Sequence, residues 1–179
     1  MNEHTQTRLP LINELEKLGW DKNQIQFMPE WKVPKTPSDA SKRESNQSFQ
    51  GFPVDVAIFD SPSNTGNYEN VQIIIETKAP DIESGINQLK IYMGLEPHVL
   101  LGIWTNGTEL SRVYRTSKGG FEVERHSVLP RPGESLLKSG VSKLKWSDLK
   151  EPTTSDLKKT FLRLLNVIVS QDTRSTRRD

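Results

Sequence analysis

Two β-prone segments that lie close together in the chain constrain the fold more than any other feature. Segments 54–60 and 71–77 are rich in branched and aromatic residues, and a stretch rich in Ser, Pro, Asn and Gly separates them. Such segments favour strands, and such a separator favours a short connection between antiparallel neighbours. We expect this pair to form the centre of a sheet.

Periodicity and turn residues predict the elements around this pair. Pro10 near the start and Gly19 at the end delimit a first amphipathic helix, and Pro29 weakens the strand that follows, as suits an edge or a bulge. The unbroken apolar run near residue 100 indicates a strand buried on both faces. The expected helices cover 8–18, 82–96 and 155–169, and the further expected strands cover 25–33, 99–104, 109–115 and 121–125. A helix between two strands, combined with hairpins, predicts an α/β fold with a mixed β-sheet flanked by helices.

The composition bounds the domain count and the environment. A chain of 179 residues is long enough for one domain, expected at 1–150, and we expect a C-terminal helix and basic tail at 151–179 to lead into a further domain absent from the chain. No apolar run reaches the roughly 18 to 20 residues that a bilayer span needs, which predicts no membrane partner. The absence of cysteine and of a secretory signal predicts a cytoplasmic location, and the net charge of +1 neither requires nor excludes nucleic acid.

An acid and a lysine two residues apart can carry chemistry where a buried strand ends. On a strand such residues point to the same face, because side-chain direction has a period of two. Only Glu76/Lys78 ends a run that favours the interior of a sheet, so charges there need a reason. The acid-x-Lys pattern occurs four times in this sequence, at Glu30/Lys32, Glu76/Lys78, Asp148/Lys150 and Asp156/Lys158.

Asp55, on the neighbouring predicted strand, supplies a second acid. A hairpin can bring Asp55 beside Glu76, with Lys78 on the same side. Two close carboxylates repel each other, and a hard divalent cation such as Mg²⁺ relieves that repulsion with oxygen ligands. A bound metal polarises a phosphodiester and activates water, and a lysine can orient that water or stabilise charge growing on the phosphate. The three residues together predict phosphodiester hydrolysis.

The segments PVDVAIFD, IIIETKAP, INQLKIYMG and LLGIWTNGTEL, within residues 8–125, resemble the N-terminal nuclease domain of type I restriction enzyme R subunits. That family is a QxxxY-containing branch of the PD-(D/E)xK nuclease superfamily. The resemblance implies a restriction-endonuclease-like fold and Mg²⁺-dependent cleavage of double-stranded DNA, with Mn²⁺ able to replace Mg²⁺. The sequence departs from a strict Pro-Asp pair, because Val54 stands between Pro53 and Asp55.

The same resemblance assigns roles residue by residue. It makes Asp55 and Glu76 metal ligands as well as catalytic acids, and it makes Lys78 the catalytic cation. It adds the backbone carbonyl of Thr77 to the metal site. It also adds Glu14, because many members of the family carry an acid on the first helix.

Further residues are expected to support the site or to contact DNA. Gln88 and Tyr92 match the QxxxY signature, and a four-residue step on a helix places them on one face. Without the resemblance, the same two residues are typical of a polar helix face with a half-buried tyrosine.

Segment 34–51 separates the first strand from the central pair. It is rich in Lys, Ser, Asp, Asn and Gln, which predicts a loop that is poorly ordered without DNA. Lys35, Lys42 and Arg43 lie in this segment, and we expect them to contact phosphate.

Several functions remain open at the level of sequence. The expected function is a Mg²⁺-dependent endodeoxyribonuclease of a type I-like restriction or fused restriction-modification protein, with methyltransferase and specificity subunits or domains as further partners. The rivals are a catalytically inactive module that binds DNA or a subunit, and a DNA-repair nuclease. The sequence has no G-x-x-x-x-G-K-[ST] loop, so ATP or S-adenosylmethionine would act only through domains or subunits outside this chain.

Overall fold

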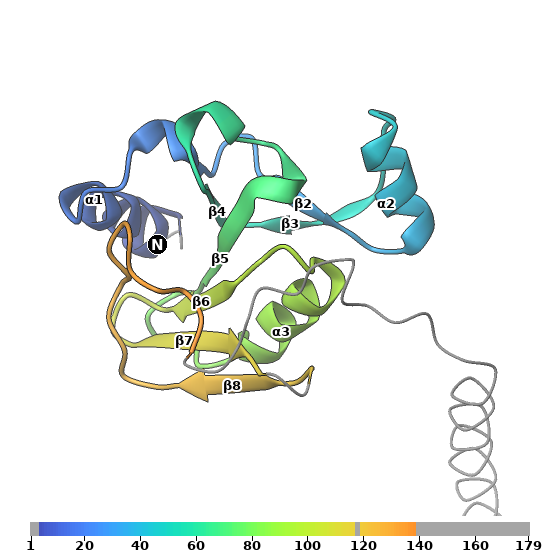
Figure 1. The fold of residues 1–179 in the computed structure, drawn as a ribbon. Coiled ribbons are helices and arrows are strands. Elements are labelled where there is room, and N and C mark those ends of the chain that lie inside the picture. The colour runs from blue at the N-terminus through green and yellow to red at the C-terminus, as the bar shows by residue number, and fades with distance from the viewer. Residues whose placement is uncertain (1–3, 117–118, 139–179) are drawn as a thin grey trace, which may run out of the picture. The chain divides into compact units, whose positions relative to one another are not determined.

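The computed structural model of the chain describes residues 4–116 and 119–138 (Figure 1). The helix expected at 155–169 and the extension expected at 151–179 lie outside the described residues. Within the described residues, no helix has the length and apolarity needed to cross a bilayer.

A mixed β-sheet of six strands forms the centre of the fold. Its order is β1-β4-β5-β6-β7-β8, and only β5 and β6 are parallel, whereas the other neighbours are antiparallel. The six strands are β1 (Ile25–Gln26), β4 (Val56–Phe59), β5 (Val71–Thr77), β6 (Leu101–Thr105), β7 (Leu110–Arg115) and β8 (Phe121–Glu124). The sequence-based prediction of an α/β fold with a mixed sheet flanked by helices is confirmed, and the arrangement is consistent with a restriction-endonuclease-like fold.

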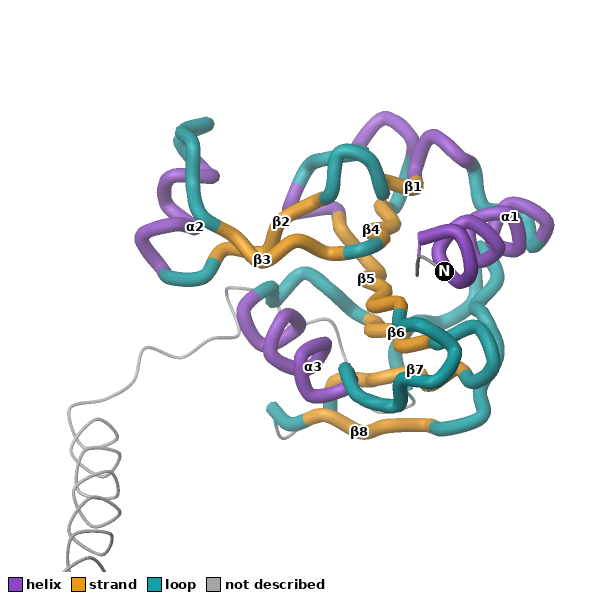
Figure 2. Tube along the Cα trace, turned by 180° about the vertical axis from the view of Figure 1, so that it is seen from behind, coloured by secondary structure: helices purple, strands orange, loops and turns teal. Residues whose placement is uncertain are grey.

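Helices α1 (Leu9–Lys17) and α3 (Ile86–Leu95) cover opposite faces of this sheet (Figures 1 and 2). Alternation along β5 explains how one strand serves both faces, because Ile73 and Ile75 pack in the cluster with α1 whereas Ile74 packs in the cluster with α3. Every residue of β6 is buried, as expected for a strand covered on both faces. Glu76 has the same parity as Ile74, and the strand therefore directs it to the α3 side.

A second sheet of two strands joins β2 (Trp31–Pro34) to β3 (Gly51–Val54). The strand expected at 25–33 is therefore two strands, and the first, β1, lies at an edge of the large sheet as Pro29 suggested. The remaining helical turns are η1 (His4–Arg8), η2 (Lys22–Gln24), η3 (Pro62–Asn64) and η4 (Tyr68–Asn70).

The prediction that segment 34–51 is a loop is wrong at its centre, where α2 (Pro37–Glu44) forms. Thr36 caps this helix, because its Oγ1 accepts the backbone N–H of Asp39 at 3.1 Å. The carboxylate of Asp39 in turn accepts the backbone N–H of Gln50 at 3.3 Å and so ties the helix to the chain that returns to β3. Capping and tertiary contacts thus overcome the polar composition from which we expected a loop.

The crossover from β5 to β6 begins with a loop, residues 78–85, that side-chain hydrogen bonds hold in place before α3. The Nδ2 of Asn106 donates to the carbonyls of Pro80 and Ile82, and the Nε1 of Trp104 donates to the carbonyl of Ser84 at 2.9 Å. Gly85 then caps the helix with a φ of +128°, a conformation that favours glycine. These contacts explain why α3 starts at residue 86 and not at 82.

Candidate active site

The strand register places Asp55 next to Glu76. Val56 of β4 pairs with Ile75 of β5, Asp55 immediately precedes the first of these residues, and Glu76 immediately follows the second. On its other side Glu76 pairs with Trp104 of β6. Glu76 is only 3% exposed. A buried acid at the end of an otherwise apolar strand has a desolvation cost that a specific role must offset.

Asp55 stands between two strands that belong to different sheets. The ladder between β4 and β5 ends at the pair Val56 and Ile75, and Val54 of β3 pairs with Trp31 in the small sheet. The carboxylate of Asp55 supplies the acceptor for Thr77 in place of a backbone carbonyl, because its Oδ2 accepts the backbone N–H of Thr77 at 2.7 Å and the hydroxyl of Thr77 at 2.9 Å. The other oxygen, Oδ1, accepts from Nη2 of Arg8. Asp55 therefore continues the hydrogen bonding of β5 at its C-terminal end as well as contributing a charge.

Lys78 is held from several directions. Its Nζ lies 2.5 Å from Oε1 of Glu76, and its backbone N–H donates to the carbonyl of Thr105 at 2.9 Å. Its own carbonyl accepts the hydroxyl of Thr7 at 2.8 Å, which fixes the start of the α1 region to the end of β5. The side chain also passes Gly85, where a β-carbon would lie 3.1 Å from its Cε. The lysine is thus positioned, and its ammonium is directed to Glu76.

Gln88 and Tyr92 form one unit on α3. The Nε2 of Gln88 donates to the hydroxyl of Tyr92 at 2.6 Å. Burial raises the pKa of Tyr92; the hydrogen bond from Gln88 opposes this, and among the nearby charges Glu76 and Asp55 raise the pKa while Lys78 lowers it. Asp55, Glu76 and Lys78 thus all lie close enough to the Tyr92 hydroxyl to affect its pKa. The structure therefore brings these three residues and the Gln88–Tyr92 pair into one region.

Tyr92 also connects this region to the small sheet. Its ring stacks on Phe52 of β3, with centroids 5.4 Å apart, and Nζ of Lys35 lies 5.0 Å from the centroid of Phe52. Lys35 therefore lies close to the stacked rings of Phe52 and Tyr92, and Lys42 is exposed on α2.

Arg43 has a different environment from the one expected of a phosphate contact. Its Nη1 lies 2.6 Å from Oε2 of Glu96, whose side chain is fully buried. The guanidinium also lies 4.1 Å from the ring centroid of Tyr68. These contacts engage Arg43 inside the protein. Sequence reasoning did not detect Glu96, because nothing in a helix-terminal acid followed by proline indicates a buried ion pair.

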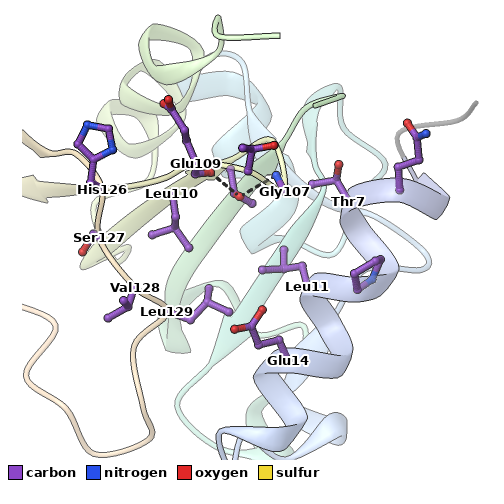
Figure 3. Close-up of a pocket in the computed structure, with 14 residues that line it drawn as sticks. Thr7, Leu11, Glu14, Gly107, Glu109, Leu110, His126, Ser127, Val128 and Leu129 are labelled. Atoms are coloured by element: carbon purple, nitrogen blue, oxygen red, sulfur yellow. Dashed lines mark hydrogen bonds between the residues drawn. The ribbon is translucent and has the colours of Figure 1, made fainter. Parts of the chain in front are cut away.

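Glu14 is exposed on α1, which covers the face of the sheet opposite to the one that Glu76 shares with Ile74. It lines a cavity of about 450 Å³ together with Glu109 and His126, and the close-up shows these side chains coming from α1 and from the chain around β7 and β8 (Figure 3). In residues 4–116 and 119–138, no group of three or more His, Cys, Asp and Glu side chains is placed to hold a metal ion. The described structure therefore does not join Glu14 to Asp55 and Glu76 in a three-acid cluster.

The donor set that remains fits Mg²⁺. Asp55, Glu76 and the carbonyl of Thr77 offer oxygen ligands, which hard cations prefer, and Mg²⁺ commonly uses one or two carboxylates and keeps several waters. Each acid already has a cationic partner, Arg8 for Asp55 and Lys78 for Glu76. A metal ion would have to displace or rearrange at least one of these contacts.

Of the other acid-x-Lys pairs, only Glu30/Lys32 lies within the described residues, and it does not form an acid–lysine ion pair like that of Glu76 and Lys78. Lys32 is exposed on β2, and Glu30 contacts Arg8 at 3.3 Å, whereas Asp148/Lys150 and Asp156/Lys158 lie outside the described residues. Comparison of the chain with protein-family models, with curated proteins and with solved structures found no match.

Proposed function

We propose that this chain contains a Mg²⁺-dependent endodeoxyribonuclease domain that hydrolyses phosphodiester bonds of double-stranded DNA, as part of a type I-like restriction or fused restriction-modification protein. One observation carries the proposal. The end of β5 holds a buried acid paired with a lysine, beside a second acid in register and within electrostatic reach of the Gln88–Tyr92 pair. The resemblance to the R-subunit nuclease domains assigns chemistry to these same positions.

The chain's own residues divide the work in this proposal. Asp55, Glu76 and the carbonyl of Thr77 would hold Mg²⁺, which supplies Lewis-acid activation of water and of the phosphate. Lys78, kept in place by Glu76, donates hydrogen bonds to the attacking water or to the phosphate as charge develops on it. Gln88 and Tyr92 brace the α3 side of the site.

A catalytically inactive module that binds DNA or a subunit is the second candidate. The observation that favours it is the structural role of Asp55, which caps Thr77 and pairs with Arg8 and would be needed without any catalysis. A DNA-repair nuclease has the same chemistry as the leading proposal and differs from it only in substrate.

Single-turnover cleavage of supercoiled plasmid by the whole protein separates catalysis from binding. ATP and S-adenosylmethionine are supplied with Mg²⁺, and an EDTA sample measures the metal-free background. We expect Lys78→Met to reduce cleavage by about 10²- to 10³-fold, because one transition-state donor is lost, while filter binding of DNA at two salt concentrations stays near wild type.

Lys32→Met is the matched control, because Lys32 belongs to another acid-x-Lys pair and is exposed on β2. We expect it to cleave at the wild-type rate. Undiminished cleavage by Lys78→Met would remove Lys78 from the reaction. A wild-type protein that binds DNA but does not cleave it with Mg²⁺ or Mn²⁺ would favour the inactive module.

A further inference from the structure

Arg8 is a buried cation at the candidate active site that the motif does not include. Its side chain is 10% exposed, and its Nη2 contacts Oδ1 of Asp55, whose side chain is 15% exposed. Thr7, the preceding residue, donates its hydroxyl to the carbonyl of Lys78. Two consecutive residues before α1 thus attach this end of the helix to the motif.

The guanidinium of Arg8 is shared between two acids. Its Nη1 lies 3.3 Å from Oε1 of Glu30, while Nη2 contacts Asp55. Glu30 is more exposed, at 37% for its side chain, and lies in the chain just before β2. Arg8 therefore has a second carboxylate in reach if Asp55 takes another partner.

A divalent cation and a guanidinium compete for the same carboxylate. They repel each other, and the repulsion is strong where both are shielded from water. Oδ2 of Asp55 is already occupied by the N–H and hydroxyl of Thr77, so a metal ion that binds Asp55 must reach Oδ1, the oxygen that Arg8 holds.

We propose that Arg8 is a positioning residue that keeps Asp55 oriented in the metal-free protein and sets its metal affinity, by yielding Oδ1 to the metal and remaining paired with Glu30. This inference rests on the proposed metal-dependent function. It adds a specific consequence: the site binds divalent cations more weakly than its two acids alone would, because binding must first break the contact with Arg8.

Mn²⁺ titration without DNA tests this inference directly. Mn²⁺ replaces Mg²⁺ because free Mn²⁺ is counted by electron paramagnetic resonance. We expect Arg8→Gln to bind Mn²⁺ at least tenfold more tightly than wild type, and Arg8→Lys to stay nearer to wild type because it keeps the charge. The gain should disappear in Arg8→Gln/Asp55→Asn, because the released oxygen is then no longer a carboxylate.

Glu30 provides a variant with the opposite expected sign. Glu30→Gln removes the alternative acceptor, and we expect Mn²⁺ affinity to fall. In an Arg8→Gln background the same substitution should have much less effect, and this coupling is a readout that a merely structural role of Arg8 would not produce. Because Glu30 is partly exposed, this variant also keeps the test valid if Arg8→Gln does not fold.

Arg112→Gln is the matched control, because Arg112 is another buried arginine with a carboxylate partner, Glu134, at 2.6 Å. It should leave Mn²⁺ affinity unchanged. Equal affinity in wild type and Arg8→Gln, or no coupling with Glu30, would overturn the role of Arg8 and leave the metal site standing. Absence of Mn²⁺ binding in wild type and in every variant would overturn the metal-dependent function itself, and the role of Arg8 with it.

Discussion

Gly85→Ala tests whether the loop before α3 sets the position of Lys78. A β-carbon at residue 85 would lie 2.8 Å from Nε1 of Trp104 and 3.1 Å from Cε of Lys78, and the backbone there has a φ of +128°. Trp104 cannot retreat easily, because it is 2% exposed and donates to the carbonyl of Ser84. Backbone strain of about 1–3 kcal/mol and overpacking of about 1–3 kcal/mol together predict a loss of about 2–6 kcal/mol in the free energy of unfolding.

A glycine-to-alanine substitution inside α3, at Gly94, should act in the opposite direction. Nothing lies within 4 Å of a β-carbon there, and the backbone is helical. Because glycine lowers helix stability, Gly94→Ala should stabilise the protein by about 0.5–1 kcal/mol. Urea unfolding measures both variants against wild type, and cleavage under conditions where all three are folded reports on Lys78.

Two results would refute this reasoning. A stability of Gly85→Ala within about 0.5 kcal/mol of wild type, the usual range for surface substitutions, would show that residue 85 does not need its glycine. Full cleavage activity in a destabilised Gly85→Ala would show that the contact with Lys78 has no bearing on the reaction.

Two further predictions concern residues around the site. Arg43→Met should lower the free energy of unfolding, measured in urea, by about 3–5 kcal/mol, because it removes the ion-pair partner of the fully buried Glu96. The salt dependence of DNA binding should stay unchanged. Weaker DNA binding at unchanged stability would instead support Arg43 as a phosphate contact. Tyr92 has a pKa raised by burial, so its contribution to stability is complete below the unfolded value of about pH 10 and is lost as pH rises through the folded pKa. Between about pH 9 and about pH 11, the urea concentration at the unfolding midpoint should therefore fall less in Tyr92→Phe than in wild type. An equal fall in both proteins would contradict the prediction.

Sequence patterns predicted the central strands better than their surroundings. The run that becomes β5 is rich in β-branched residues and lies between turn residues and Pro80, so its bounds at 71–77 could be predicted. The expected strand at 25–33 and the expected loop at 34–51 depend instead on tertiary partners. Pairing of Trp31–Pro34 with Gly51–Val54 joins residues too far apart for a local pattern to reveal. The cap of α2 is local, because Thr36 accepts from Asp39 three residues on, but the polar composition of the segment outweighed this signal in the prediction.

The site shows the same division. Period-two alternation and a hairpin were enough to bring Asp55 beside Glu76 and to place Lys78 with it. The partners of these residues were not predictable, because Arg8 reaches Asp55 across 47 positions of sequence and contributes no motif of its own. Only the packing of the α1 region against the end of β5 brings that cation to the acid.

The bond between Asp55 and the backbone of Thr77 changes what an evolutionary comparison of this protein can reveal. Natural selection for folding alone would retain a hydrogen-bond acceptor at position 55, because the backbone N–H of Thr77 at the end of β5 depends on it. Under the proposed function, a lineage that had lost cleavage would keep Asp55 for that reason, and substitutions at Lys78 would mark the loss first. The lysine, and not the aspartate, is therefore the position at which relatives can be sorted into active and inactive proteins.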